Sequence, residues 1–191
     1  MDREVDGNLD SVPTHYSAVA VTIHWISALL IISQIVIGLK FGDLPKGAGP
    51  EKIHLFTWHK TIGVAILLLA VLRIVVRLLN KPPPLPATLP RWQREIAVWN
   101  HRLFYFLLFA LPLTGLSLVS KRAVGGMTDL LGGLKFPVVP LGPVGEAHSL
   151  LAWSLIALLA LHVAAALKHQ LFDGPLVSRR MSPFGGPGRI D

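Results

Sequence analysis

The chain has 191 residues, of which 52% are apolar and 15% are charged, and its mean hydropathy is +0.55. These values exclude an ordinary soluble domain and favour a membrane protein. The absence of cysteine excludes disulfides, thiolate-bound iron–sulfur clusters and covalently attached haem. The formal charge is +7, but Lys and Arg lie mainly at the ends of apolar windows, which argues against nucleic-acid binding.

Four apolar windows are each long enough to cross a hydrocarbon core, which takes about 20 helical residues. In chain order they are residues 18–39, 57–79, 96–119 and 147–172. We therefore predict an all-α membrane protein, a four-transmembrane-helix bundle over residues 14–175. Residues 1–13 are predicted to be a disordered N-terminus without signal-peptide features, and residues 176–191 a C-terminal tail.

An even number of spans places both termini on one side of the membrane, which we call the inner side; the opposite side is the outer side. The inner side holds 11 Lys and Arg residues and the outer side 7, so the positive-inside rule predicts cytoplasmic termini. The outer set is Lys40, Lys46, Lys52, Lys60, Lys121, Arg122 and Lys135. The Gly- and Pro-rich stretch 120–146 is expected to cover the outer mouth of the bundle.

Ionisable side chains are costly inside apolar windows and are therefore candidates for function, and four of the histidines there are singled out: His24, His59, His148 and His162. His148 and His162 are fourteen residues apart, which places both on nearly the same helix face, about 21 Å apart along the axis. By depth, His24 pairs with His162 toward the inner side. His59 pairs with His148 toward the outer side. The alternative is that each histidine only hydrogen-bonds a neighbouring helix.

A haem suits two such pairs, because it supplies its own equatorial nitrogens and needs only two axial ligands from the protein. It also needs space, and each of the four histidines is followed four positions later by a small residue. These residues are Ala28, Gly63, Ala152 and Ala166. The same position after His54, His101 and His169 holds a larger residue. We therefore predict two bis-histidine haem sites, with His54 as the main rival to His59.

The apolar windows also resemble a known family. The segments that carry the resemblance are IHWISALL, WHKTIGVAILLLAVLRIVVRL, NHRLFYFLLFALPLTG and HSLLAWSLIALLALHVAAALKHQLF. Together they are similar to the bacterial cytochrome b561 family over residues 16–183. That family is related to the cytochrome b subunits of nickel–iron hydrogenases and includes the membrane superoxide oxidase.

The resemblance implies a multi-pass protein of the bacterial inner membrane, with two non-covalent haem b groups on His24, His59, His148 and His162. His54 has no counterpart in the family's pattern. Iron with two axial imidazoles is suited to outer-sphere electron transfer, because no position is open for substrate.

The resemblance further implies a quinone site beside the inner haem, with ubiquinone as the electron acceptor. His101 and His169 are the candidates, since imidazole can donate hydrogen bonds and protons to quinone carbonyls. Arg73 and Arg77, one turn apart at the inner end of the second span, are candidate partners of haem propionates. The positive-inside rule explains these two arginines equally well.

The outer loops carry more basic than acidic residues, and such a rim would concentrate an anion such as superoxide. It would also suit an acidic redox protein. Two functions are therefore expected: a superoxide:ubiquinone oxidoreductase (a superoxide oxidase), or a non-catalytic subunit that connects a periplasmic redox partner or dehydrogenase to the quinone pool. The loops contain no evident docking domain, which favours the first. The oligomeric state and the physiological donor are left open.

Overall fold

The structure is a computed structural model that describes residues 15–45, 47–80, 82–84, 89–172 and 179–182. Its long helices are α1 (Ala18–Asp43), α2 (Gly49–Leu79), α3 (Arg91–Leu118) and α4 (Gly145–Phe172). The shorter elements are η2 (Ser120–Arg122), β1 (Met127–Asp129), η3 (Leu131–Gly133), β2 (Lys135–Pro137) and η4 (Arg179–Met181). All four long helices are long and apolar enough to cross a membrane, which confirms the predicted fold class. The predicted N-terminal segment 1–13 lies outside the described residues.

Each long helix extends beyond its apolar window at one end. α2 begins at Gly49, with Pro50 in its first turn, where proline's fixed φ favours a helix start. α3 begins at Arg91, directly after Pro90. The windows were shorter because hydropathy marks the lipid-facing part of a helix, whereas the backbone hydrogen bonds continue into the polar interface. One consequence is that His54 lies on α2, with an exposed side chain.

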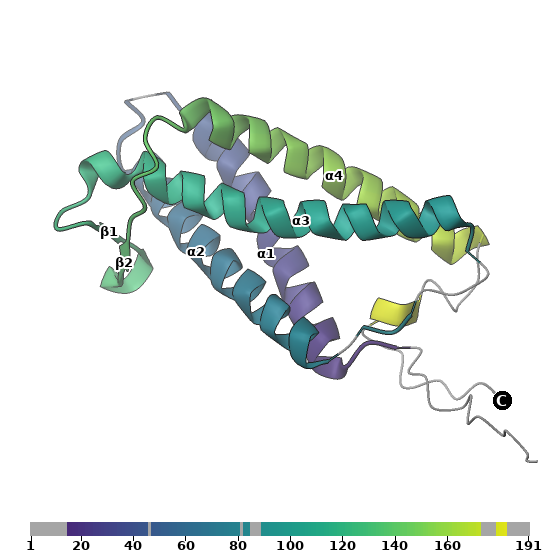
Figure 1. Cartoon of the computed structure of the whole chain (residues 1–191). Coiled ribbons are helices and arrows are strands. Elements are labelled where there is room, and N and C mark those ends of the chain that lie inside the picture. The colour runs from purple at the N-terminus through teal and green to yellow at the C-terminus, as the bar shows by residue number, and fades with distance from the viewer. Residues whose placement is uncertain (1–14, 46, 81, 85–88, 173–178, 183–191) are drawn as a thin grey trace, which may run out of the picture.

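The bundle consists of two antiparallel helical hairpins, α1 with α2 and α3 with α4 (Figure 1). A central cluster of buried residues joins them: Ile31, Ile62, Ile66, Ala70, Leu107, Leu108 and Leu155. Other large apolar side chains, such as Leu68, Leu150 and Leu161, are exposed on the outside of the bundle. An apolar exterior of this kind is suited to lipid rather than to water.

The outer loop between α3 and α4 packs against the outer parts of α2 and α3. Its β1 and β2 strands pair antiparallel (Figure 1). Leu130 of this loop is buried with Val64 and Leu116. The Lys60 ammonium donates to the Asp129 carbonyl at 2.6 Å, which ties α2 to the loop.

At the inner end, the described part of the predicted C-terminal tail folds back onto α1. The Trp25 indole N–H donates to the Met181 carbonyl at 2.9 Å, and the Tyr16 N–H donates to the Arg180 carbonyl at 3.4 Å. The Arg180 guanidinium donates to the Pro83 carbonyl in the linker after α2. Figure 1 shows this η4 turn in yellow beside the purple start of α1.

Candidate cofactor sites between the helices

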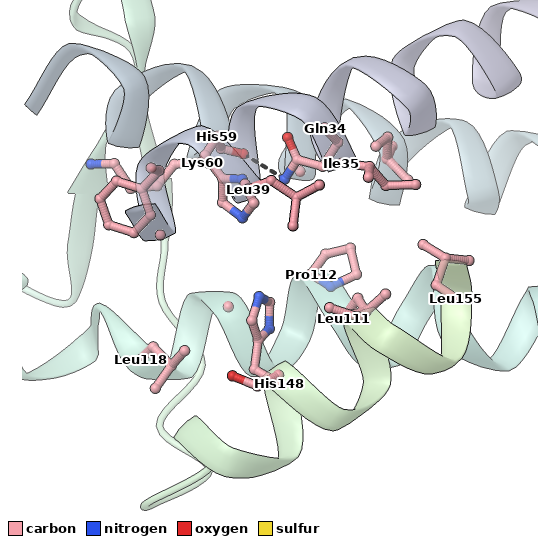
Figure 2. Close-up of a pocket in the computed structure, with 18 of the residues that line it drawn as sticks. Gln34, Ile35, Leu39, His59, Lys60, Leu111, Pro112, Leu118, His148 and Leu155 are labelled. Atoms are coloured by element: carbon pink, nitrogen blue, oxygen red, sulfur yellow. Dashed lines mark hydrogen bonds between the residues drawn. The ribbon is translucent and has the colours of Figure 1, made fainter. Parts of the chain in front are cut away.

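The outer site lies between the two helical hairpins. His59 on α2 and His148 on α4 point toward each other across a pocket (Figure 2), with their ring centres 6.4 Å apart. The pocket has a volume of 560 Å³ and is lined by all four long helices. Ligand and cofactor pockets commonly measure about 300–1,000 Å³. The structure therefore brings together the predicted outer pair around a space of suitable size.

Small residues make room around these two rings. Gly63 and Ala152 line the pocket, as the sequence pattern predicted. A Cβ atom on Gly38 of α1 would lie 3.2 Å from Cε1 of His59, and one on Gly115 of α3 would lie 3.3 Å from Cε1 of His148. Side-chain atoms rarely pack this closely, so glycine at both positions lets a helix backbone approach a ring. We did not predict these two glycines from the sequence.

A hydrogen bond fixes the proton of His148. The Thr114 hydroxyl lies 2.9 Å from Nδ1 of His148 and donates its own proton to the Ala110 carbonyl at 2.8 Å or the Leu111 carbonyl at 3.0 Å. Because the hydroxyl has one proton, it accepts from Nδ1–H of His148. Nε2 then keeps its lone pair, which is the arrangement that metal-binding imidazoles use.

The other side of the outer site contains unsatisfied polar atoms. Nδ1 of His59 is buried and has no hydrogen-bond partner among the described residues. The Gln34 amide donates to the His59 carbonyl at 2.9 Å (Figure 2), while its buried Oε1 is also without a described partner. Buried polar groups in proteins are nearly always paired. Such orphaned atoms are compatible with a site that is completed by a bound group.

The inner site contains the two predicted ligands and a third imidazole beside them. His24 on α1 and His162 on α4 have ring centres 6.4 Å apart, and His101 on α3 lies 6.2 Å from His162. Distance alone does not separate the two possible partners of His162. The pair His24–His162 joins the two hairpins, as the outer pair does, whereas α3 and α4 belong to the same hairpin.

Hydrogen bonds also surround the inner rings. The Asn100 amide lies 3.1 Å from Nδ1 of His162, and a half-turn of the amide lets its oxygen accept Nδ1–H. His101 donates Nδ1–H to the Ala97 carbonyl at 2.6 Å, so its Nε2 keeps a lone pair. Both rings can thus present Nε2 to a bound group.

His24 differs, because its hydrogen-bond partner is a cation. Nη2 of Arg73 lies 3.3 Å from Nδ1 of His24. A guanidinium only donates hydrogen bonds, so Nδ1 of His24 is the acceptor here. The Arg73 guanidinium carbon also lies 6.0 Å from the centre of the Tyr105 ring.

The remaining predicted site residues lie at the inner end. Arg77 is exposed, one turn beyond Arg73 on α2. His169 is half-buried in the last turn of α4, seven residues or about 10 Å beyond His162 along the axis. These placements agree with an inner-end role and leave the predicted functions of both residues as predictions.

The spacing of both histidine pairs fits a shared metal. A metal–imidazole bond is about 2.0–2.1 Å for a first-row metal such as zinc, and a ring nitrogen lies about 1.2 Å from the ring centre. Two imidazoles on opposite sides of one metal therefore have centres about 6.4 Å apart, which matches both observed pairs. Among the described residues, no three or more His, Cys, Asp or Glu side chains are arranged so that they could hold a metal ion by themselves. A two-ligand site of this kind suits a metal that brings its other ligands with it.

Comparison with known proteins identifies the family to which the chain belongs. Residues 15–184 match the family model described as prokaryotic cytochrome b561. The chain is 29% identical to cytochrome b561 homolog 2 of Escherichia coli (strain K12), over 90% of this chain and 93% of the relative. It is 31% identical to the probable superoxide oxidase CybB of Yersinia pestis, over 88% of this chain and 96% of the relative. The chain therefore belongs to the prokaryotic cytochrome b561 family, whose members are haem b-binding electron-transfer proteins of the bacterial membrane.

Proposed function

We propose that the protein oxidises superoxide on the outer side of the inner membrane and passes the electrons to ubiquinone on the inner side. Two haem b groups would carry them, one between His59 and His148 and one between His24 and His162. The observation that carries the proposal is the equal ring separation of 6.4 Å in both pairs. The name of the Yersinia pestis relative supports the choice of superoxide as donor.

Haem b held by two histidine side chains would supply one-electron transfer without binding substrate at iron. The overall reaction balances when two superoxide ions give two molecules of oxygen, and one quinone takes up two electrons and two protons. His148 and His162, fourteen residues apart on α4, hold the two sites about 21 Å apart along the helix axis.

The mouth of the outer pocket carries positive charge. Lys60 follows His59 and lines the pocket, with its ammonium 5.2 Å from the centre of the Phe56 ring. The nearby acid Asp129 is paired with Lys135, with an N–O distance of 3.7 Å. An ammonium at the pocket mouth raises the local concentration of an anionic substrate.

Arg73 can hold a carboxylate when the inner site is filled. An imidazole that binds iron through Nε2 carries its proton on Nδ1 and cannot accept a hydrogen bond there. His24 can therefore serve as a ligand only if Arg73 leaves Nδ1, which frees the guanidinium. This requirement supports the prediction that Arg73 pairs with a haem propionate, with Arg77 one turn farther toward the interface.

At the inner end, His101 and His169 are the proposed quinone residues. His101 is half-buried beside His162, with its Nδ1–H held by the Ala97 carbonyl. Its Nε2 is therefore available to exchange protons with a quinone oxygen. The inner side holds 11 Lys and Arg residues and the outer side 7, which supports cytoplasmic termini. The protons taken up by the quinone would therefore come from the cytoplasm.

The proposal is tested with the purified full-length protein in detergent, supplied with a steady source of superoxide and no other protein. We expect the haem absorbance to show reduction, followed by formation of one ubiquinol for every two superoxide ions consumed. The His148→Ala variant is the matched control and should lose both reactions. If haem is reduced only after addition of a periplasmic redox protein, the protein is an electron-transfer subunit and the superoxide oxidase proposal is wrong.

A further inference from the structure

The C-terminal turn η4 is packed next to a predicted inner ligand. Trp25 follows His24 on α1, and the centres of these two rings are 5.7 Å apart. The same indole donates to the Met181 carbonyl of η4 at 2.9 Å. One tryptophan side chain thus links the C-terminal turn to the inner site.

Arg180, in the middle of η4, is a buried cation with unused donors. Only 8% of the residue is exposed. Its Nη2 donates to the Pro83 carbonyl, and its guanidinium carbon lies 5.8 Å from the centre of the Tyr16 ring. Nε and Nη1 are buried and have no hydrogen-bond partner among the described residues. Burial lowers the pKa of Arg180 from its ordinary value, although Tyr16 opposes the shift.

Positive charge converges on the same place from two other residues. Arg73, Arg77 and Arg180 all act electrostatically on the His101 ring. Within the described ranges, no carboxylate forms an ion pair with any of these three arginines. A buried cation without a counter-charge is strongly unfavourable, whereas an anion held by several N–H donors compensates for the cost. The buried Arg180 guanidinium is therefore incompletely compensated without an anionic group.

We propose that Arg180 binds a carboxylate of the inner haem, so that the C-terminal turn is part of the cofactor site. Planar guanidinium groups are well suited to carboxylates, because they combine charge with several directed donors. Propionate carboxylates are the anionic groups that haem b brings into a protein. The inference rests on the proposed haem between His24 and His162, but not on superoxide or quinone as reactants.

The test is a redox titration of the purified, haem-loaded full chain, with each haem followed by its absorbance and no superoxide or quinone present. The inner haem is first identified as the one that His24→Ala removes. We expect Arg180→Gln to lower the reduction potential of that haem and leave the outer one unchanged, because loss of a nearby cation favours ferric iron. Arg180→Lys should restore most of the shift. Arg91→Gln, an exposed arginine at the start of α3, is the matched control and should change neither potential.

A second variant distinguishes a purely structural role of Arg180 from binding of a carboxylate. Trp25→Phe removes the hydrogen bond to Met181 while the Arg180 guanidinium is retained, and limited proteolysis reports whether the C-terminal turn stays docked. If Arg180→Gln loosens the turn but leaves both potentials unchanged, Arg180 only anchors the tail and the proposal is wrong. If it instead releases bound anionic phospholipid with unchanged potentials, the ligand is a lipid phosphate and the proposal is again overturned. If the unmodified protein has no haem that His24→Ala removes, the proposed haem arrangement itself has failed.

Discussion

The rings of His59 and His148 face each other with their centres 6.4 Å apart, and the rings of His24 and His162 have the same separation. Each pair joins α4 to a helix of the other hairpin. This equal spacing is the basis of the two proposed cofactor sites.

Replacing an outer ligand should remove one haem of two. We expect His148→Ala or His59→Ala to halve the pyridine haemochrome signal per protein, because the inner site has its own ligands. His54→Ala should keep the full signal, since this side chain is exposed on α2. Loss of both haems from a folded variant, or of neither, would contradict the pairing.

At the inner site, His24 and His101 are alternative partners of His162, and substitutions can distinguish between them. His24→Ala should abolish the inner haem. His101→Ala should keep both haems and slow ubiquinol formation, since His101 is proposed to act on the quinone. The measurement combines haem content with the rate of quinol production. An inverted result, with the inner haem lost from His101→Ala and kept in His24→Ala, would assign His101 as the ligand.

Thr114→Val should weaken the outer haem without removing it. The substitution deletes the hydroxyl that accepts Nδ1–H of His148. Loss of such a partner typically reduces metal affinity about 10- to 100-fold. Transfer of haem to an excess of apo-acceptor protein measures the change. Ser154→Ala is the control. The exposed Ser154 hydroxyl on α4 also donates to a backbone carbonyl four residues earlier, so this variant should behave like the unmodified protein.

Gly38 and Gly42 form a matched pair for testing the close approach of α1 to the outer site. A Cβ at Gly38 would meet Cε1 of His59 at 3.2 Å, whereas one at Gly42 would meet nothing within 4 Å. We therefore expect Gly38→Ala to displace the His59 ring and accelerate loss of the outer haem in the transfer assay. Gly42→Ala should have no such effect. Equal loss rates in both variants would show that the ring tolerates the added methyl group.

The charge of Lys60 should control the encounter with superoxide. We expect Lys60→Gln to slow haem reduction and to weaken its dependence on ionic strength, because charges are screened over about 10 Å at 0.1 M salt. Lys60→Arg should retain most of the rate and the full salt dependence. An unchanged salt dependence in Lys60→Gln would exclude this residue from the steering of the substrate.

The sequence by itself determined the membrane class, the number of spans and the four histidines at membrane depth. These features are local, since hydropathy and helical period depend only on residues near one another in the chain. The spacing of His148 and His162 also set the distance between the two sites, because both residues lie on one rigid helix. The ends of the spans were less well predicted, as the start of α2 at Gly49 shows.

Only the tertiary structure decided which residues surround the histidines, because such contacts depend on the rotation and crossing of neighbouring helices. On every helix, two site residues are separated by fourteen positions: His24 and Gly38, His59 and Arg73, His101 and Gly115, and His148 and His162. Because neighbouring helices run in opposite directions, the first residue of the pair on one helix lies at the same depth as the second residue of the pair on its neighbour. A glycine at that spacing gives no functional signal in the sequence until packing places it against a ring. The same holds for Arg180, which the fold brings from the end of the chain to the inner site.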